Sequence, residues 1–198
     1  MSPLNKRIQI IIGSTRSARV GDQVGEYVKQ VVQENSPSFY EYEIVDLRDH
    51  PLPFFDEVAI PAYKTYAKDH TFKWSSKISE ADAFIFVSPE YNGSIPAVLK
   101  NAIDFLYQEW KNKPTVIVSY ANKGGSGAAA NLRAITTRIG MKVAETMPAL
   151  ISTNDVRDPA TNRIADTNKA FAPQKESIIQ AAKELIELIN STAVTSAA

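Results

Sequence analysis

Short apolar runs that alternate with amphipathic stretches constrain the fold of this chain more than any other feature of its sequence. Residues 7–12 (RIQIII), 83–87 (AFIFV) and 115–120 (TVIVSY) are short and rich in β-branched side chains. Runs that are apolar at almost every position are typical of parallel strands covered on both faces. Residues 40–46 (YEYEIVD) alternate between apolar and polar, which predicts a strand at the edge of the sheet, and residues 148–152 are a weaker fifth candidate.

Helical spacing of apolar residues fills the gaps between these runs. The clearest stripes lie at residues 20–31, 98–106, 132–139 and 178–189. Residues 61–80 predict a further, more polar helix. Alternating strands and helices predict an α/β fold, a three-layer sandwich on a five-stranded parallel sheet in the order 2-1-3-4-5. We expect one domain over residues 1–190 and a tail, 191–198, that lacks periodicity and frays.

The charge balance and the lack of cysteine exclude several classes of function. Lys and Arg together number 22, and so do Asp and Glu, so the net charge is zero and neither nucleic acid nor an anionic membrane is an expected partner. With no cysteine, the chain has no disulfides, thiol nucleophiles or thiolate metal sites. Any electrons must therefore move on a bound cofactor.

Metal binding and membrane insertion are also disfavoured. His50 and His70 are the two histidines, and their separation does not place them on one helical face, so we expect no metal site. No run of about 18 apolar residues is long enough to cross a bilayer, and the first residues lack the order of a secretion signal. We therefore expect a cytoplasmic protein.

The segment after the first predicted strand has the composition of an anion site. Residues 13–21 (GSTRSARVG) supply three hydroxyl groups, two guanidinium groups and a run of backbone N–H groups at the start of a helix. These are the donors and charges that bind a phosphate. The segment is not a Walker A loop, because no Gly-Lys-Ser/Thr follows. A polar turn that caps the helix, with both arginines in solvent, is the alternative.

Two later segments predict a site for a planar ligand. Residues 88–96 (SPEYNGSIP) place Tyr91 on a tight turn, where its ring can flank a flat molecule. Residues 119–128 (SYANKGGSGA) are rich in glycine, so their backbone can approach a ligand closely. Each segment by itself is also an ordinary turn. Because all three segments follow strands of one parallel sheet, they converge at one edge, and a phosphate site beside a planar site indicates FMN.

Three stretches also resemble one known family. They are residues 11–24 (IIGSTRSARVGDQV), residues 88–106 (SPEYNGSIPAVLKNAIDFL) and residues 113–120 (KPTVIVSY). Together they resemble the NADPH-dependent FMN reductases, which include flavin, quinone, azo-dye and chromate reductases. The resemblance spans roughly residues 6–148 and implies a flavodoxin-like fold.

Position by position, the resemblance implies a set of FMN-binding residues. Ser14, Arg16, Arg19 and Val20 would hold the phosphate; Pro89, Glu90, Tyr91 and Asn92 would line the ring and the ribityl chain; Ser119, Tyr120, Gly124 and Gly125 would close over the ring. The chain departs from the family at Ala121-Asn122, where members commonly have two glycines. We expect the Cβ of Ala121 to restrict a backbone torsion at that point.

The resemblance implies an NAD(P)H-dependent FMN oxidoreductase. Hydride would pass from NADPH or NADH to the flavin N5 and then to a small acceptor such as a quinone, a free flavin, an azo dye or an oxidised metal ion. No side chain then needs to act as an acid or base, so no catalytic residue is assigned. The N–H groups of Gly124 and Gly125, and the side chain of Lys123, are candidates to stabilise the reduced flavin. Members of the family also predict a homodimer or homotetramer.

Other functions fit parts of the pattern. A flavodoxin-type electron carrier shares the fold, although such carriers tend to be strongly acidic and this chain is neutral. A phosphoryl-binding sensor or hydrolase without flavin is a third alternative.

Two apolar regions have more than one interpretation. Residues 50–66 are rich in aromatic residues and proline, and would form a pocket wall, a surface against a second subunit, or a loop that packs its own side chains on the domain. Phe105, Leu106, Tyr107 and Trp110 extend beyond one helical stripe, which favours a dimer interface there, whereas Trp74 and Trp110 also suit a core.

Overall fold

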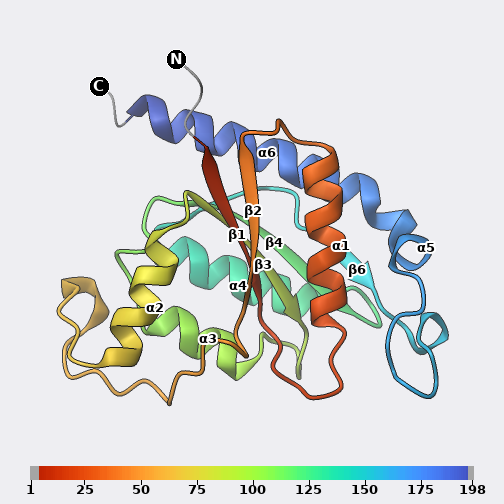
Figure 1. Cartoon of the computed structure of the whole chain (residues 1–198), viewed down its shortest axis with the longest axis horizontal. Coiled ribbons are helices and arrows are strands. Elements are labelled where there is room, and N and C mark those ends of the chain that lie inside the picture. The colour runs from red at the N-terminus through yellow and green to blue at the C-terminus, as the bar shows by residue number, and fades with distance from the viewer. Residues whose placement is uncertain (1–4, 196–198) are drawn as a thin grey trace.

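The computed structural model describes residues 5–195 and places a parallel sheet between two layers of helices (Figure 1). The strands are β1 (Lys6–Ile12), β2 (Tyr40–Asp46), β3 (Ala83–Pro89), β4 (Pro114–Ala121), β5 (Lys142–Val143) and β6 (Ala149–Ile151). They follow the order β2-β1-β3-β4-β5, and every pairing is parallel. The predicted strand order is therefore confirmed.

The position next to β4 is filled by two short strands instead of the single one predicted at residues 148–152. β5 pairs with the start of β4, and β6 pairs with its end. Pro148 lies between them and has no N–H to donate to a neighbouring strand, although its carbonyl accepts from Ser119. The chain therefore leaves the ladder after β5 and returns at β6.

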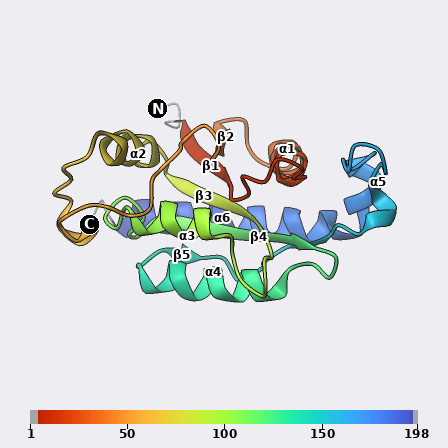
Figure 2. The ribbon, with the colours of Figure 1, turned by 90° about the horizontal axis from the view of Figure 1, so that it is seen from below.

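Six α-helices cover the sheet: α1 (Gly21–Glu34), α2 (Asp69–Ser79), α3 (Ala97–Asp104), α4 (Ser126–Arg138), α5 (Thr167–Phe171) and α6 (Lys175–Thr195). Short 3-10 turns occupy Pro61–Tyr63, Asn154–Val156 and Ala172–Gln174. Figure 2 shows α1 and α4 on opposite sides of β4. Among the described residues, no helix is both long and apolar enough to cross a membrane.

Two helix boundaries differ from those predicted. The expected helix over residues 61–80 begins only at Asp69, because the preceding turn ends at Lys64 in the left-handed conformation (φ 53°). α6 continues past Asn190 as far as Thr195, so the helix ends later than expected, while the fraying of the tail stays a prediction. The rest of the predicted tail, 196–198, lies outside the described residues.

The hydrophobic core has two halves, one on each face of the sheet. One half joins alternate strand residues to α1 and α6, and the other joins the intervening residues to α2, α3 and α4. β3 is buried along its whole length because both of its faces are covered, which explains its unbroken apolar run.

The structure also corrects the first interpretation of the residues after α3. Phe105, Leu106 and Trp110 lie in the core together with Trp74, and the Trp74 and Trp110 ring centroids are 6.3 Å apart. These residues are therefore not a dimer surface, and the core interpretation of both tryptophans is confirmed.

Candidate active site

A cavity of about 490 Å³ opens at the carboxyl ends of β1, β3 and β4. In Figure 1 these ends and their loops gather in the lower part of the molecule. Most residues predicted to bind cofactor line it: Ser14, Arg16, Arg19, Val20, Pro89, Glu90, Tyr91, Tyr120 and Gly125. Its volume is in the range typical of cofactor sites.

Three predicted site residues do not line the cavity: Asn92, Ser119 and Gly124. Asn92 and Gly93 form the tip of a two-residue turn, both with positive φ, and the flanking Tyr91 and Ser94 exchange backbone hydrogen bonds of 2.8 and 3.1 Å. This is the geometry that an Asn-Gly pair favours. Asn92 therefore shapes the turn that presents Tyr91.

The segment 14–20 follows β1, and we call it the anion loop. The backbone N–H groups of residues 14–19 donate to no acceptor within the part of the chain that the structure describes. The side chain of Arg16 is exposed and forms no hydrogen bond or ion pair with the described residues. The loop thus offers unused donors and a free positive charge, which suits a phosphate.

Arg19 lies at the cavity wall, but its guanidinium is already engaged. It pairs end-on, through Nη1 and Nη2, with the two carboxylate oxygens of Asp46, and Nη1 also donates to the carbonyl of Ser14 at 2.6 Å. The hydrogen bonds that Arg19 donates to Asp46 raise the pKa of Arg19, more than offsetting the effect of burial. The side chain of Arg19 therefore supports the loop.

The β1 and β3 loops meet through two side chains. Ser14 Oγ lies 2.8 Å from the hydroxyl oxygen of Tyr91, and the guanidinium carbon of Arg16 lies 6.0 Å from the centre of the Tyr91 ring. The tyrosine is thus held between the anion loop and the planar part of the site. Its ring is positioned to flank a flat ligand.

Glu90 joins the β3 loop to the start of α4. Its Oε2 accepts from the N–H of Ala128 at 3.1 Å. A Cβ at Gly127 would come within 2.8 Å of that oxygen and 2.7 Å of the Gly93 carbonyl, so only glycine fits there. The carboxylate also stabilises the helix electrostatically, because negative charge is favourable at a helix N-terminus.

The loop after β4, residues 122–125, is a tight turn, and we call it the glycine turn. Gly124 and Gly125 have φ values of 82° and 80°, and Gly124 N–H donates to the carbonyl of Ala121 at 3.1 Å. Ser119 Oγ, which is buried, donates to the carbonyl of Gly124 at 2.7 Å. Ser119 and the N–H of Gly124 therefore hold the turn.

The replacement of two family glycines by Ala121 and Asn122 causes no backbone strain. Neither residue has a positive φ, because the left-handed conformations of this loop fall on Gly124 and Gly125. Ala121 ends β4 and pairs in register with Ile151 of β6. The expected restriction at Ala121 is thus absent from the folded backbone.

Known proteins match this chain over most of its length. The family model of the NADPH-dependent FMN reductases matches residues 6–154. The chain belongs to this family. The reductase is 41% identical over 178 residues to an NAD(P)H-dependent FMN reductase of Schizosaccharomyces pombe, covering 85% of this chain and 88% of the relative. It is 36% identical over 194 residues to an NAD(P)H-dependent FMN reductase of a Nectria species, covering 92% of this chain and 96% of the relative.

Solved structures show the same fold at lower sequence identity. The flavoenzyme FerB of Paracoccus denitrificans, an NAD(P)H:(acceptor) oxidoreductase, superposes with a TM-score of 0.64 at 20% identity over 90% of this chain and 98% of that one. An oxidoreductase of Corynebacterium diphtheriae superposes with a TM-score of 0.69 at 16% identity, over 95% of this chain and 98% of that one. The predicted flavodoxin-like fold is confirmed. The reductase is an NAD(P)H-dependent oxidoreductase that uses FMN to reduce a small acceptor.

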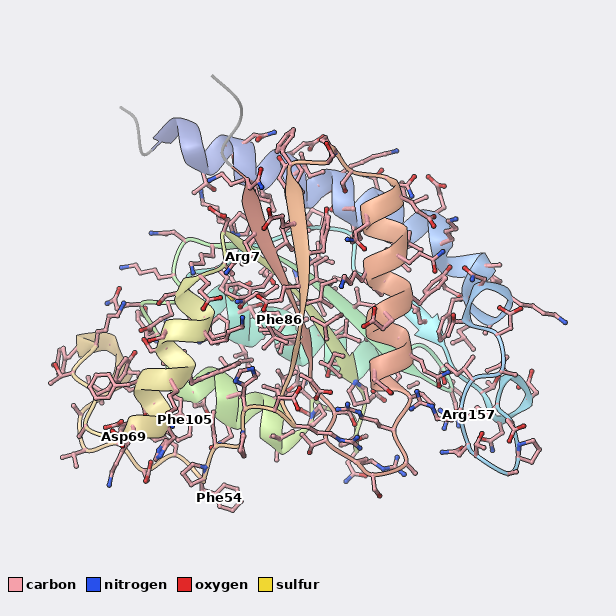
Figure 3. All side chains as sticks on the ribbon, in the orientation of Figure 1. Arg7, Phe54, Asp69, Phe86, Phe105 and Arg157 are labelled. Atoms are coloured by element: carbon pink, nitrogen blue, oxygen red, sulfur yellow. The ribbon has the colours of Figure 1, made fainter. Side chains whose placement is uncertain are left out.

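Sequence reasoning missed one cationic residue of the reductase's cavity. Arg157 follows β6 and lines the cavity, where it donates to the carbonyl and the hydroxyl of Ser152 at 3.1 and 3.0 Å. Figure 3 labels it beside the loops that follow β6. The family motifs end before this position, so no pattern in the sequence marked it. Within the described residues, no cluster of three or more His, Cys, Asp or Glu is arranged for a metal ion.

Proposed function

We propose that the cavity at the ends of β1, β3 and β4 is the FMN site of this reductase. The single observation that supports this most strongly is the anion loop, whose unused N–H groups and free Arg16 side chain match a phosphate. The anion loop and the glycine turn line one cavity of about 490 Å³, which leaves room for a ribityl chain and a ring. Tyr91 and the backbone at Gly125 would flank that ring.

In this proposal the chain's own residues bind FMN and orient it. When bound, FMN supplies the redox chemistry, accepting reducing equivalents from NAD(P)H and passing them to the acceptor. Ser14 and Arg16 would hold the phosphate, and the N–H of Gly125 and the side chain of Lys123 lie at the wall where negative charge on the ring would be stabilised. Burial raises the pKa of Tyr120, so this phenol stays protonated and is not a proton-transfer group near neutral pH.

One spectroscopic experiment tests this function. The purified protein is mixed with FMN, its absorbance spectrum is recorded, and NADPH is then added without oxygen. Bound flavin whose absorbance bleaches on NADPH addition is the expected result. A flavin that is bound but reduced only with a partner protein would indicate an electron carrier, and a protein that binds no FMN would favour a phosphoryl-binding function.

We also propose that two or more copies of the chain associate through the segment between β2 and α2. Phe54, Val58 and Tyr63 are 88%, 93% and 73% exposed, and Phe54 projects away from the body of the molecule (Figure 3). Isolated apolar residues are common on surfaces, but three in one segment favour an interface.

The backbone of this segment is well anchored. Glu57 accepts from the N–H groups of Ala67 and Lys68 at 2.9 and 3.0 Å, and Asn101 bonds the N–H of Phe55. A fixed backbone that displays apolar side chains suits a preformed contact. Light scattering of the native protein and of Val58→Asp tests the proposed interface, with a dimer or tetramer expected for the first and a smaller species for the second.

We also propose a cytosolic location, which agrees with the lack of cysteine.

A further inference from the structure

Side chains from distant parts of the sequence bind the backbone carbonyls of the anion loop. Each carbonyl from residue 14 to residue 19 accepts a hydrogen bond from a side-chain donor. The N–H groups of the same residues have no acceptor among the described residues. The peptide groups of this loop are therefore satisfied on one side only.

Arg48, just after β2, binds the middle of the loop. Its Nε donates to the carbonyl of Thr15 at 3.4 Å, and its Nη2 donates to the carbonyls of Arg16 and, at 3.2 Å, Ser17. A guanidinium has several donors in a rigid plane, so one side chain can hold three consecutive carbonyls.

The two ends of the loop are held in the same way. Arg19 donates to the carbonyl of Ser14 at the start, and at the other end Asn162 and Arg163 donate to the carbonyls of Ala18 and Arg19 at 3.3 and 3.0 Å. Asn162 and Arg163 lie beyond residue 154, where the match to the family model ends. A segment outside the family model thus contacts the site.

Asp46 fixes both arginines. Its carboxylate pairs with Arg19, and its Oδ1 also accepts the backbone N–H of Arg48 at 3.0 Å. Burial raises the pKa of Asp46, but the hydrogen bonds and charges of Arg19 and Arg48 outweigh it and hold the pKa below its ordinary value. The carboxylate is therefore ionised, and it orients the guanidinium of Arg19 and fixes the backbone of Arg48 before any ligand arrives.

In a trans peptide the N–H and the C=O point in opposite directions. Carbonyls held from one side therefore leave the N–H groups facing the other, and the loop lines the cavity. We propose that Arg48 is a positioning residue for the FMN phosphate. It binds no cofactor itself, but it holds the carbonyls of residues 15–17 so that the loop's N–H groups are preorganised for the anion. This inference rests on the proposed FMN site.

The test separates the phosphate from the rest of the flavin. Flavin-free protein is titrated with FMN and, separately, with riboflavin, which lacks the phosphate, and binding is followed by flavin fluorescence. Arg48→Ala is expected to weaken FMN binding about tenfold, on the scale of one or two lost hydrogen bonds, and to leave riboflavin binding unchanged. Arg48→Lys is expected to restore only part of the loss, since a single ammonium cannot span three carbonyls.

Arg7→Ala is the matched control. Arg7 is also an exposed arginine, but it lies in the first half of β1 and pairs with Glu80 at 2.8 Å, far from the carboxyl end that forms the cavity. The Arg7→Ala variant should bind both FMN and riboflavin as the native protein does. Unchanged riboflavin binding by Arg48→Ala also shows that the variant is folded.

The outcomes are distinguishable. An unchanged ratio of FMN to riboflavin affinity in Arg48→Ala, with native protein preferring FMN, would overturn the role of Arg48 while leaving the FMN site intact. Equal loss of both ligands would overturn it too, because Arg48 would then support the whole cavity instead of the phosphate. Native protein that does not prefer FMN to riboflavin would overturn both the proposed phosphate position and the positioning role.

Discussion

The two loops that close the cavity from opposite ends acquire their shapes in different ways. The glycine turn is held by its own neighbours, because Gly124 bonds Ala121 and Ser119 bonds Gly124. The anion loop is held from far along the chain, by Arg48 and by the segment after β6. The first is a local structure and the second is a product of tertiary contacts.

This difference suggests a division of roles. A turn set by glycine conformations needs little support and suits the close approach of a flat ring. The N–H groups of the anion loop must stay free for a ligand, so they cannot also serve as hydrogen-bond donors to the carbonyls of the same loop. Its carbonyls therefore need donors from elsewhere in the fold. Each of the following variants perturbs either the anion loop or the glycine turn.

The largest expected effect comes from removing the charge that fixes both arginines. Asp46→Asn leaves Arg19, whose side chain is 6% exposed, with only the more distant carboxylate of Asp22, 3.9 Å from its Nε. Loss of one partner of such a buried pair costs about 3 to 5 kcal/mol. Urea unfolding should show a fall of this order in the free energy of unfolding, and a fall within error of zero would show that the pair adds nothing to the stability of this region.

The same pair predicts a pH dependence. The folded-state pKa of Asp46 lies below the ordinary value of 3.8, so its contribution to stability is present above that value and is lost as pH falls through the folded pKa. Unfolding curves of the native protein should show this loss in the acid range. Asp46→Asn should lack that part of the loss, and identical acid profiles for the two proteins would contradict the prediction.

Arg16→Ala tests the direct contact with the phosphate, whereas the Asp46 variant tests the contacts that hold the anion loop. A charge-assisted hydrogen bond contributes about 1.5 to 3 kcal/mol, so FMN binding should weaken by one to two orders of magnitude on that scale. Equilibrium titration measures this. Stability should be unchanged, because the guanidinium of Arg16 forms no hydrogen bond or ion pair with the described residues. Native affinity in the variant would place the phosphate elsewhere.

Gly125→Ala perturbs the local loop. A residue with a Cβ costs about 1 to 2 kcal/mol in the left-handed conformation, and the new Cβ would lie 3.2 Å from the Ser119 Cβ. The free energy of unfolding should fall by about that amount, as measured by urea unfolding. Ser126→Ala, at the next position and at the start of α4, is the matched control and should have a much smaller effect.

Lys123→Ala should have the smallest effect. The residue lies at the cavity wall beside the glycine turn and forms no contact that the fold requires. If its charge stabilises the reduced flavin, the rate of flavin reduction by NADPH in stopped flow should fall a few-fold, with the FMN affinity nearly unchanged. A native rate would remove Lys123 from the mechanism.

Much of the fold was predictable because its signals are local. The unbroken apolar runs of β1, β3 and β4 follow from burial of both faces, and the strand order is a common one for chains in which strands and helices alternate. The split between β5 and β6 was not predictable, because two- and three-residue strands have too few positions to form a pattern. The Asn92-Gly93 turn was predictable, because the pair favours positive φ at both positions.

For the site, the sequence by itself determined the chemical groups at each strand end: hydroxyls and arginines after β1, a tyrosine turn after β3 and glycines after β4. Tertiary structure decided what those groups do. It paired Arg19 with Asp46, placed Ser119 in contact with the glycine turn, and brought Arg48, Arg157 and Arg163 to the cavity and its supporting contacts. The reason is physical: residue type limits the bonds a side chain can form, but the partner it bonds is set by which distant segments the fold places beside it.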